Sequence, residues 1–352
     1  MKNAAFAIPG DIDQRTGGYI YERSLLHALR DDGRTVRHVE LPGTFPSPSP
    51  AEMAQSVELL AGLPAEEPLI LDGLVYGSID TQGLARVRSP LVAMIHHPLG
   101  LETGLPADRA RQLIETETAN LALADHVLVP SPHTARVLVA DFAVAEDRIT
   151  IAPPGFSKPS NTAVTKASPP LILSVGLLAA RKGHDVLLRA LARVTDLEWR
   201  ADIVGKTHDP AVHAELAALI DANDLGDRVR LCGELDTPAL DSLFRQASLF
   251  ALATRYEGYG MVFSEALAYG LPIVTCRAGA VPETVPDGTG ILVEVDDDEA
   301  FAHALRRMLA DEALRDAMAS HASVAGGALR SWADTARSVG VVLDRLAAAR
   351  GR

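Results

Sequence analysis

The residues best suited to chemistry lie in one segment, residues 254–283, which reads TRYEGYGMVFSEALAYGLPIVTCRAGAVPE. Two carboxylates, Glu257 and Glu265, flank Gly258 and Gly260 in an E-x7-E pattern. Glycine lets bare backbone approach a ligand because it has no side chain. Carboxylates accept hydrogen bonds from hydroxyl groups, so the acids are suited to a polyhydroxylated ligand. Two acids at this spacing also arise by chance in a chain with 46 Asp and Glu, so the interpretation rests on the whole string.

The surrounding sequence predicts how these residues are held. An apolar run over 247–252 indicates a strand, so Glu257 follows the carboxyl end of a strand, where open α/β sheets bind ligands. A helical pattern runs from Met261 to Tyr269 and ends at a Gly-Leu-Pro stop signal. The free N–H groups and positive dipole end at the start of this helix suit a diphosphate. Glu265, one turn further along, is then placed to bind a ribose, and the segment predicts a sugar-nucleotide site.

The string as a whole resembles the donor-site signature of the retaining glycosyltransferases of family 4, which have the two-domain GT-B fold. The resemblance rests on the glutamates and glycines, on the apolar residues 261–263, and on the EALA helix leading to GLPIV. It implies an α/β protein with two Rossmann-like domains that face each other across a deep cleft, and a final helix that crosses back to the first domain. It also implies that Gly258, Tyr259, Gly260 and Met261 bind the donor.

Cations for a diphosphate lie in the segment SVGLLAARKGHDVLLRAL. Gly176 ends a strand there, and Arg181 and Lys182 precede a helix, which places both cations near a ligand-binding edge. A nucleoside diphosphate gains negative charge as it leaves, and preorganised cations lower that barrier. We therefore expect Lys182 to bind the phosphate. In the family that the string resembles, the residue after the strand glycine is commonly arginine, whereas it is Leu177 here, and Arg181 is a candidate to supply the missing charge.

Two segments of the first half complete the expected site. Gly17 and Gly18 precede a helix, and the resemblance implies that such a loop approaches the diphosphate and the acceptor. His96 and His97 follow a strand, and the resemblance implies that one of them, with His96 the better match, contacts the donor sugar. A lone histidine in this position is also often a structural group. The first loop has no G-x-G-x-x-G spacing, which argues against a dinucleotide site.

The other donor-binding candidates are Gly205, Gly233 and Glu234, which lie at the ends of strands. The resemblance implies that loops at these positions frame the nucleotide base. Backbone atoms would make many of these contacts, so the side chains do not distinguish uridine from guanosine.

No cofactor and no metal ion are expected. Asp296, Asp297 and Asp298 look like a metal-binding D-x-D motif, but they lie between a strand and a helix, where an N-cap with acids on the first turn explains them. Cys232 and Cys276 lack ligand spacing and lie in apolar, strand-like surroundings, so we expect two structural thiols.

Composition is typical of a globular protein with two domains. The chain has 352 residues, 47% hydrophobic and 22% charged, and no apolar run reaches the length of a membrane span. The opening MKNAAFAIPG indicates a buried strand and not a secretory signal, which favours the cytoplasm. A net charge of −13 argues against nucleic acid. The absence of a clustered basic helix face argues against membrane docking, so a soluble acceptor is favoured.

Apolar runs alternate with helical patterns, which predicts mainly parallel sheets with helices on both faces. The first predicted domain is 1–158 with a final helix at about 331–352, and the second is 168–330. The segment 153–170, rich in proline, serine and threonine, is the predicted linker. Strands are expected at 4–8, 69–72, 91–95, 126–130, 149–152, 171–175 and 200–204, and helices at 21–30, 133–142, 186–194, 212–223 and 331–346.

Together with the resemblance, the sequence predicts a retaining, metal-independent glycosyltransferase that moves a sugar from a nucleoside diphosphate sugar to a hydroxyl-bearing acceptor. Glu257, Lys182, His96 and Arg181 are its expected catalytic residues. One alternative is a sugar-nucleotide epimerase or hydrolase on the same fold. Another is a non-catalytic nucleotide-sugar-binding protein, which only Leu177 supports.

Overall fold

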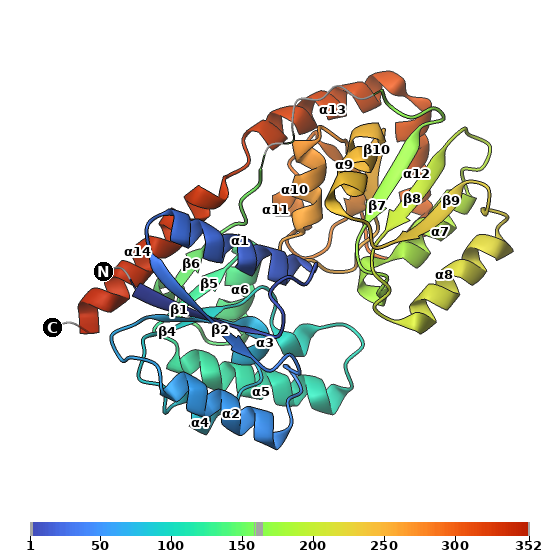
Figure 1. The fold of residues 1–352 in the computed structure, drawn as a ribbon. Helices are drawn as coiled ribbons and strands as arrows, with labels where there is room; N and C mark the ends of the chain where they lie inside the picture. Colours follow the sequence, from blue (N-terminus) through green and yellow to red (C-terminus); the bar gives the residue numbers. More distant parts are fainter. Residues whose placement is uncertain (1–2, 158, 160–164, 351–352) are drawn as a thin grey trace. The chain divides into compact units, whose positions relative to one another are not determined.

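The computed structural model describes residues 3–157, 159 and 165–350, which form two compact units (Figure 1). Unit 1 comprises Met1–Gly155 and Arg330–Arg352, and unit 2 comprises Phe156–Leu329. Each unit contains one parallel six-stranded sheet with helices against it, which confirms the predicted α/β class. Residues 158 and 160–164 of the predicted linker lie outside the described residues.

The sheet of unit 1 has the strand order β2-β1-β3-β4-β5-β6. Every residue of β3, β4 and β5 is buried, because helices cover both faces and leave no need for alternating polarity. The strands are β1 Asn3–Pro9, β2 Thr35–Leu41, β3 Leu69–Asp72, β4 Leu91–Met94, β5 His126–Val129 and β6 Ile149–Ile151.

Several helices of unit 1 begin at side-chain caps. The Ser131 side chain accepts a hydrogen bond from the Thr134 backbone N–H at 3.1 Å and so caps α6. Ser49 and Glu52 form a capping box at the start of α2. The helices are α1 Gly17–Asp31, α2 Pro50–Ala61, α3 Gly73–Tyr76, α4 Thr81–Leu84, α5 Ala107–Leu123, α6 Pro132–Asp141 and α14 Trp332–Arg350.

Some elements of unit 1 differ from the predicted positions. Helix α1 begins at Gly17, four positions before the predicted start at residue 21. Strand β2 and helices α2 and α5 were not predicted. Strand β2 lies at the edge of the sheet and mixes buried with exposed residues, and α5 buries only four side chains, so neither has a long apolar run in the sequence.

The sheet of unit 2 has the order β12-β11-β10-β7-β8-β9. Its strands are β7 Leu171–Val175, β8 Arg200–Val204, β9 Val229–Gly233, β10 Leu249–Leu252, β11 Ile273–Cys276 and β12 Gly290–Val293. Its helices are α7 His184–Ala192, α8 Pro210–Ala222, α9 Thr237–Gln246, α10 Met261–Ala268, α11 Val281–Thr284, α12 Asp298–Ala310 and α13 Glu312–Gly327. None of the helices in the described part of the chain combines the length and apolar character that a membrane crossing requires.

Helix α13 ends at Gly327, and the final helix α14 begins at Trp332. A Cβ at Gly326 would collide with the carbonyl oxygen of Leu267 in α10. Gly326 therefore permits close packing between the last turn of α13 and α10.

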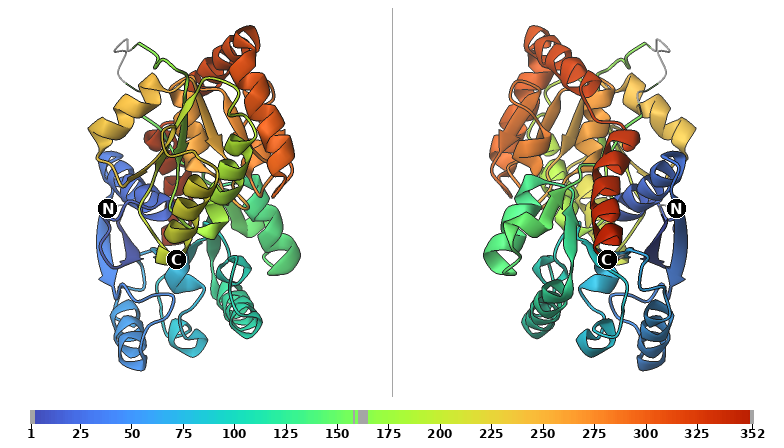
Figure 2. Two further views of the ribbon diagram at one scale, coloured as in Figure 1. Left: turned by 90° about the vertical axis from the view of Figure 1, so that its right-hand side faces the viewer. Right: turned by 90° about the vertical axis from the view of Figure 1, so that its left-hand side faces the viewer.

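The final helix, α14, belongs to unit 1 and packs along α1 (Figure 2). The guanidinium group of Arg34 donates two hydrogen bonds to Asp344, at 2.7 and 3.0 Å. Arg345 contacts Nδ1 of His126 at 2.9 Å. Two side chains near the end of the chain, Asp344 and Arg345, thus fix α14 on unit 1, in agreement with the final helix of the predicted GT-B fold.

Docking of α14 depends on neutral His126. Burial, then the nearby Arg345 and Arg148, lower the pKa of His126 to about 4, whereas an unfolded histidine has a pKa of about 6.5. Because the unfolded chain takes up the proton first, stability should fall as pH drops from about 6.5 towards 4, with no effect of this group above that range. In thermal melts followed by circular dichroism, His126→Asn, which keeps an acceptor for Arg345, should lose part of this pH dependence. An unchanged pH profile would contradict the role of His126.

Candidate functional site

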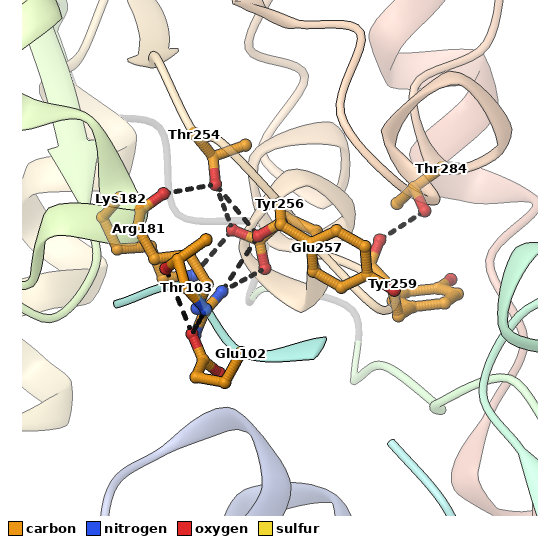
Figure 3. Close-up of polar contacts among 9 residues, drawn as sticks. All are labelled: Glu102, Thr103, Arg181, Lys182, Thr254, Tyr256, Glu257, Tyr259 and Thr284. Carbon is orange, nitrogen blue, oxygen red and sulfur yellow. Dashed lines mark hydrogen bonds and ion pairs between the residues drawn. The ribbon is translucent and has the colours of Figure 1, made fainter. Parts of the chain in front are cut away.

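The carboxylate of Glu257 is the centre of a buried polar cluster in unit 2 (Figure 3). The Nζ atom of Lys182 lies 2.6 Å from Glu257 Oε1, and Thr254 donates a hydrogen bond to the same oxygen at 3.0 Å. Nη1 of Arg181 lies 3.6 Å from Oε2. Only 6% of the surface of Glu257 is exposed, so the cluster is largely shielded from water. The structure therefore brings together three of the four predicted catalytic residues, which are Glu257, Lys182 and Arg181.

Two opposing effects set the ionisation of Glu257. Burial raises its pKa, but the positive charges of Lys182 and Arg181 and the hydrogen bonds from Lys182 and Thr254 outweigh burial and leave the pKa below its usual value. Glu257 is consequently a carboxylate at neutral pH. It can accept hydrogen bonds from a ligand but has no proton to donate.

Close backbone contacts at glycine residues hold Lys182 beside this carboxylate. Lys182 ends a short 3-10 turn, Ala180–Lys182, that follows β7, and its aliphatic stem lies across Gly176. Gly183 has φ +62°, and a Cβ there would collide with the carbonyl oxygen of Ala253 after β10. Gly183 therefore lets the start of α7 approach the loop that carries Glu257.

The loop of Glu257 is held from its other side by the turn after β11. The carbonyl oxygen of Glu257 accepts a hydrogen bond from the Ala280 N–H at 2.9 Å. Gly279 has φ +55°, and a Cβ there would clash with the same carbonyl. Thr284 donates to the carbonyl oxygen of Tyr259 at 2.6 Å (Figure 3). The orientation of the Glu257 loop thus depends on a glycine turn some twenty residues further along the chain.

The second acid, Glu265, lies within α10, and Met261 is the first residue of this helix. Gly260 precedes it with φ +84°, a conformation that only glycine adopts readily. The side chain of Glu265 is surrounded by protein but keeps some access to solvent, and no described residue donates a hydrogen bond to its carboxyl group. Burial raises its pKa to about 7. The pKa values of the two acids of the E-x7-E pattern are therefore shifted in opposite directions.

The other predicted donor-binding residues of unit 2 lie at strand ends. A Cβ at Gly205, after β8, would collide with the carbonyl oxygen of Gly176, so this glycine is required by packing between neighbouring strand ends. Gly233 ends β9 with φ +66°, and Glu234 follows it. Gly258 lies between Glu257 and Tyr259 in the loop before α10. Because the sheet is parallel, these strand ends share one edge.

The predicted residues of unit 1 lie around a second polar cluster. Gly18 contacts His96, since a Cβ on Gly18 would lie 3.6 Å from Cδ2 of the imidazole. Gly17 starts α1 beside it. Ligand atoms of His96, Glu22 and Asp72 all lie within 4.8 Å of one another. His97, the alternative to His96, has no ligand atom in this group.

The carboxyl groups of the second cluster are unusual in their ionisation. Burial raises the pKa of Glu22 to about 7, and burial followed by the charge of Glu22 raises the pKa of Asp72 well above its usual range. Burial lowers the pKa of His96. Two adjacent buried carboxyl groups and a neutral imidazole therefore face one another.

Each acid of the 296–298 run has a partner in the protein. Asp297 accepts a hydrogen bond from the Ala300 N–H at 2.8 Å and caps α12, as predicted. Asp296 and Asp298 pair with Arg255 and Arg193 at 2.7 and 2.8 Å. Cys232 and Cys276 are both free thiols. The D-x-D resemblance is thus explained by helix capping and ion pairs.

Several residues of these clusters were not predicted. Thr254 lies within the quoted donor string but was given no role, although its position after a strand was a signal. Glu22 and Asp72 carried no sequence signal, because they approach His96 only in the folded unit. Arg255 was also not predicted. It donates hydrogen bonds to Asp185 at 3.0 and 2.8 Å and so holds the start of α7.

The sequence matches two known families. Residues 21–157 match the family described as Glycosyltransferase Family 4, and residues 159–324 match Glycosyl transferases group 1. Among curated proteins, the chain is 30% identical over 277 residues to the D-inositol 3-phosphate glycosyltransferase of Nocardia farcinica, covering 72% of this chain and 61% of that protein. It is 29% identical over 238 residues to the protein of that name from Xylanimonas cellulosilytica, covering 63% of this chain and spanning 57% of that relative's length.

Solved structures with the same fold cover nearly the whole chain. Sucrose-phosphate synthase from Thermosynechococcus elongatus superposes with a TM-score of 0.84 at 24% identity and covers 99% of both chains. The Anabaena protein HepE, in complex with UDP-glucose, gives a TM-score of 0.76 at 16% identity and covers 97% of this chain and 99% of that one. At these identities the likeness concerns the fold, and it confirms the predicted GT-B class.

The buried pair predicts a coupled effect on stability. Lys182→Ala leaves the Glu257 carboxylate with one fewer cation, so unit 2 should lose on the order of 3 kcal/mol. Adding Glu257→Gln removes the buried charge and should restore much of this loss. The measurement is urea unfolding in a Trp332→Phe background, where the only remaining tryptophan, Trp199, is buried in unit 2.

The exposed pair of Arg277 and Glu294, 3.9 Å apart, offers a matched control. Arg277→Ala should change stability by less than about 1 kcal/mol because surface pairs contribute little. Additive losses in Lys182→Ala, Glu257→Gln and the double variant would show that the buried pair is not coupled.

Proposed function

Because the chain belongs to glycosyltransferase family 4 and carries the group 1 glycosyl transferase domain, we propose that it transfers a sugar from a nucleoside diphosphate sugar to a hydroxyl group of a soluble small-molecule or glycan acceptor, with retention of anomeric configuration. The observation that carries this proposal is the buried contact of 2.6 Å between Lys182 and Glu257. It places a cation and a carboxylate together at the edge of the sheet where open α/β folds bind ligands.

We assign the donor to unit 2. The diphosphate would bind Lys182 and the free backbone N–H groups at the start of α10, where the helix dipole favours negative charge. Glu265 would accept hydrogen bonds from the ribose, and Glu257 from hydroxyls of the sugar. The loops at Gly205, Gly233 and Glu234 would frame the base. The complex of HepE with UDP-glucose supports a donor of this chemical class.

Transfer would proceed on one face of the sugar. The bond between the anomeric carbon and the phosphate oxygen breaks, the acceptor oxygen forms the new bond on the same side, and a phosphate oxygen takes the acceptor proton. No protein nucleophile is required. Lys182 and Arg181 would stabilise the charge that develops on the diphosphate, so we propose that this step needs no divalent ion in unit 2.

Arg181 is a reasonable substitute for the arginine replaced by Leu177. Its guanidinium group lies 3.6 Å from Glu257 Oε2 and donates a hydrogen bond to the carbonyl oxygen of Tyr256 at 2.9 Å. A second cation is thus present in the cluster although the family position holds leucine. This weakens the only sequence feature that favoured a non-catalytic binding protein.

The function is tested by a ligand screen followed by product analysis. A panel of uridine and guanosine sugar nucleotides should contain one that raises the melting temperature, because a bound ligand stabilises the folded state. With that donor and an acceptor library, NMR should show a glycoside with the donor's anomeric configuration. Sugar release to water alone would indicate a hydrolase, and donor binding without turnover would indicate a binding protein, and either result would refute transfer.

The ionisation of Glu265 predicts a pH dependence of donor binding. A carboxylate accepts hydrogen bonds from ribose hydroxyls more strongly than a protonated carboxyl group, and burial raises the pKa of Glu265 to about 7. Affinity for UDP-glucose, or for the sugar nucleotide found in the screen, should therefore rise between pH 6 and 8. Below pH 7, it should change by up to about tenfold per pH unit. Calorimetric titration across this range provides the measurement.

Glu265→Gln removes the titrating group and should bind the donor at least about tenfold more weakly at pH 8, with a flatter pH profile. Glu312→Gln, on the exposed first turn of α13, is the matched control and should behave as the unchanged protein. An identical pH profile in Glu265→Gln would remove Glu265 from the ribose site.

A further inference from the structure

Three side chains converge in unit 1 from three different elements. Glu22 comes from α1, Asp72 is the last residue of β3, and His96 follows β4. One ligand atom from each lies within 4.8 Å of the other two. Glu22 is 1% exposed and Asp72 is 5% exposed, whereas the His96 side chain retains 24% of its surface. The group is therefore a buried cluster of ligand atoms, of which the His96 side chain is the most exposed member.

Two buried polar atoms of this cluster lack hydrogen-bond partners within the described part of the chain. Neither Oε1 of Glu22 nor Nε2 of His96 makes a hydrogen bond within the described part of the chain, although both are shielded from solvent. They lie 3.5 Å apart, too far for a good hydrogen bond. One oxygen of Asp72 accepts from the Leu74 N–H at 2.8 Å, and the carboxyl groups of Asp72 and Glu22 are hydrogen-bonded to each other. Buried polar atoms without partners are rare and call for an explanation.

Within the described residues, the cluster also lacks a compensating positive charge from lysine or arginine. In the described residues, neither Glu22 nor Asp72 forms an ion pair with lysine or arginine, whereas Glu257 in unit 2 lies close to both Lys182 and Arg181. Two adjacent buried carboxylates are costly without a cation. A proton shared between them would offset one charge, but it would leave the His96 nitrogen and a Glu22 oxygen without partners. A divalent cation would satisfy all three groups at once.

We propose that Glu22, Asp72 and His96 form a binding site for a divalent transition-metal ion of the Zn²⁺ class. In a tetrahedral zinc site with ligands at about 2.0 to 2.2 Å, neighbouring ligand atoms lie roughly 3.3 to 3.6 Å apart. The 3.5 Å separation of His96 Nε2 and Glu22 Oε1 fits this range. The imidazole nitrogen favours Zn²⁺ or Co²⁺ over Mg²⁺ and Ca²⁺, which prefer oxygen ligands.

The surroundings of His96 are those of a fixed ligand. The Tyr21 ring packs edge-on against the imidazole with centroids 4.9 Å apart, and its hydroxyl donates to the carbonyl oxygen of Ala152 at 2.7 Å. Gly18 leaves room on another side of the ring. Such outer contacts orient a metal ligand. Three protein ligands leave a fourth position for water or a hydroxyl group, as in zinc sites that are not purely structural.

This site goes beyond the proposed transfer and is separate from the donor residues of unit 2. The ion is not proposed to neutralise the diphosphate. Ligation through Nε2 replaces the contact between His96 and a donor sugar that the family resemblance implied. Metal binding can be measured on the chain without donor or acceptor, so its failure would not bear on glycosyl transfer.

The test uses the full chain, freed of metal with a chelator and titrated with ZnCl₂ by calorimetry. One Zn²⁺ should bind per chain, and Co²⁺ should give the visible absorption of a tetrahedral complex. Glu22→Gln and His96→Gln should each weaken Zn²⁺ binding by more than the roughly 10- to 100-fold that outer-shell changes cost. The adjacent His97→Gln is the matched control and should bind Zn²⁺ normally.

Melting temperatures of the wild-type protein test the site even if a variant fails to fold. Zn²⁺ should raise its melting temperature, and Mg²⁺ at the same concentration should not. The proposal is overturned if folded wild-type protein binds no stoichiometric Zn²⁺, if its Co²⁺ complex lacks the tetrahedral spectrum, or if folded Glu22→Gln and His96→Gln bind as tightly as wild type. Equal shifts with Zn²⁺ and Mg²⁺ would also overturn it.

Discussion

The arrangement of residues around the carboxyl ends of the second sheet depends on one constraint, the burial of the Glu257 carboxylate. A charge shielded from water is tolerated only with partners, so Lys182, Arg181 and Thr254 must all reach the same group. Their positions in turn require close backbone approaches, which explains why glycines precede α7 and lie in the turn after β11. The cluster is thus preorganised before any ligand arrives, and preorganised charge stabilises a transition state without rearrangement.

Unit 1 meets the same electrostatic problem with a different set of residues. Glu22 and Asp72 are as deeply buried as Glu257, but they lie beside a histidine in place of lysine and arginine. A lysine–glutamate pair is complete in itself, whereas two acids and an imidazole form a ligand set that is incomplete without a cation or proton. The two clusters are similarly buried but differ in residue type. This difference distinguishes an ion pair whose charges balance from a set of ligands that can bind an ion.

The sequence predicted those features that depend on local order along the chain. The Glu257 loop, the start of α10 and the Asp297 cap follow from strand, glycine and helix signals within a few residues. Most strands of both sheets were predicted because buried parallel strands are continuous apolar runs. Strand β2 and helix α5 lack such runs, and Glu22 meets Asp72 only after α1 packs on the sheet. Contacts between distant segments have no local pattern, so the second cluster could not be predicted.

The two acids of the E-x7-E pattern show how one short motif can provide two kinds of group. Burial acts on both, yet the pKa of Glu257 is lowered because cations outweigh burial, while burial raises that of Glu265 to about 7 without an opposing cation among the described residues. Environments that shift the pKa values of two paired acids in opposite directions are typical of sites where the two acids have different roles. Glu257 remains a permanent anion that fixes the cations, whereas Glu265 exchanges a proton near neutral pH. In the proposed function, a donor that favours the ionised form of Glu265 must displace that proton, which would couple donor binding to pH without a histidine.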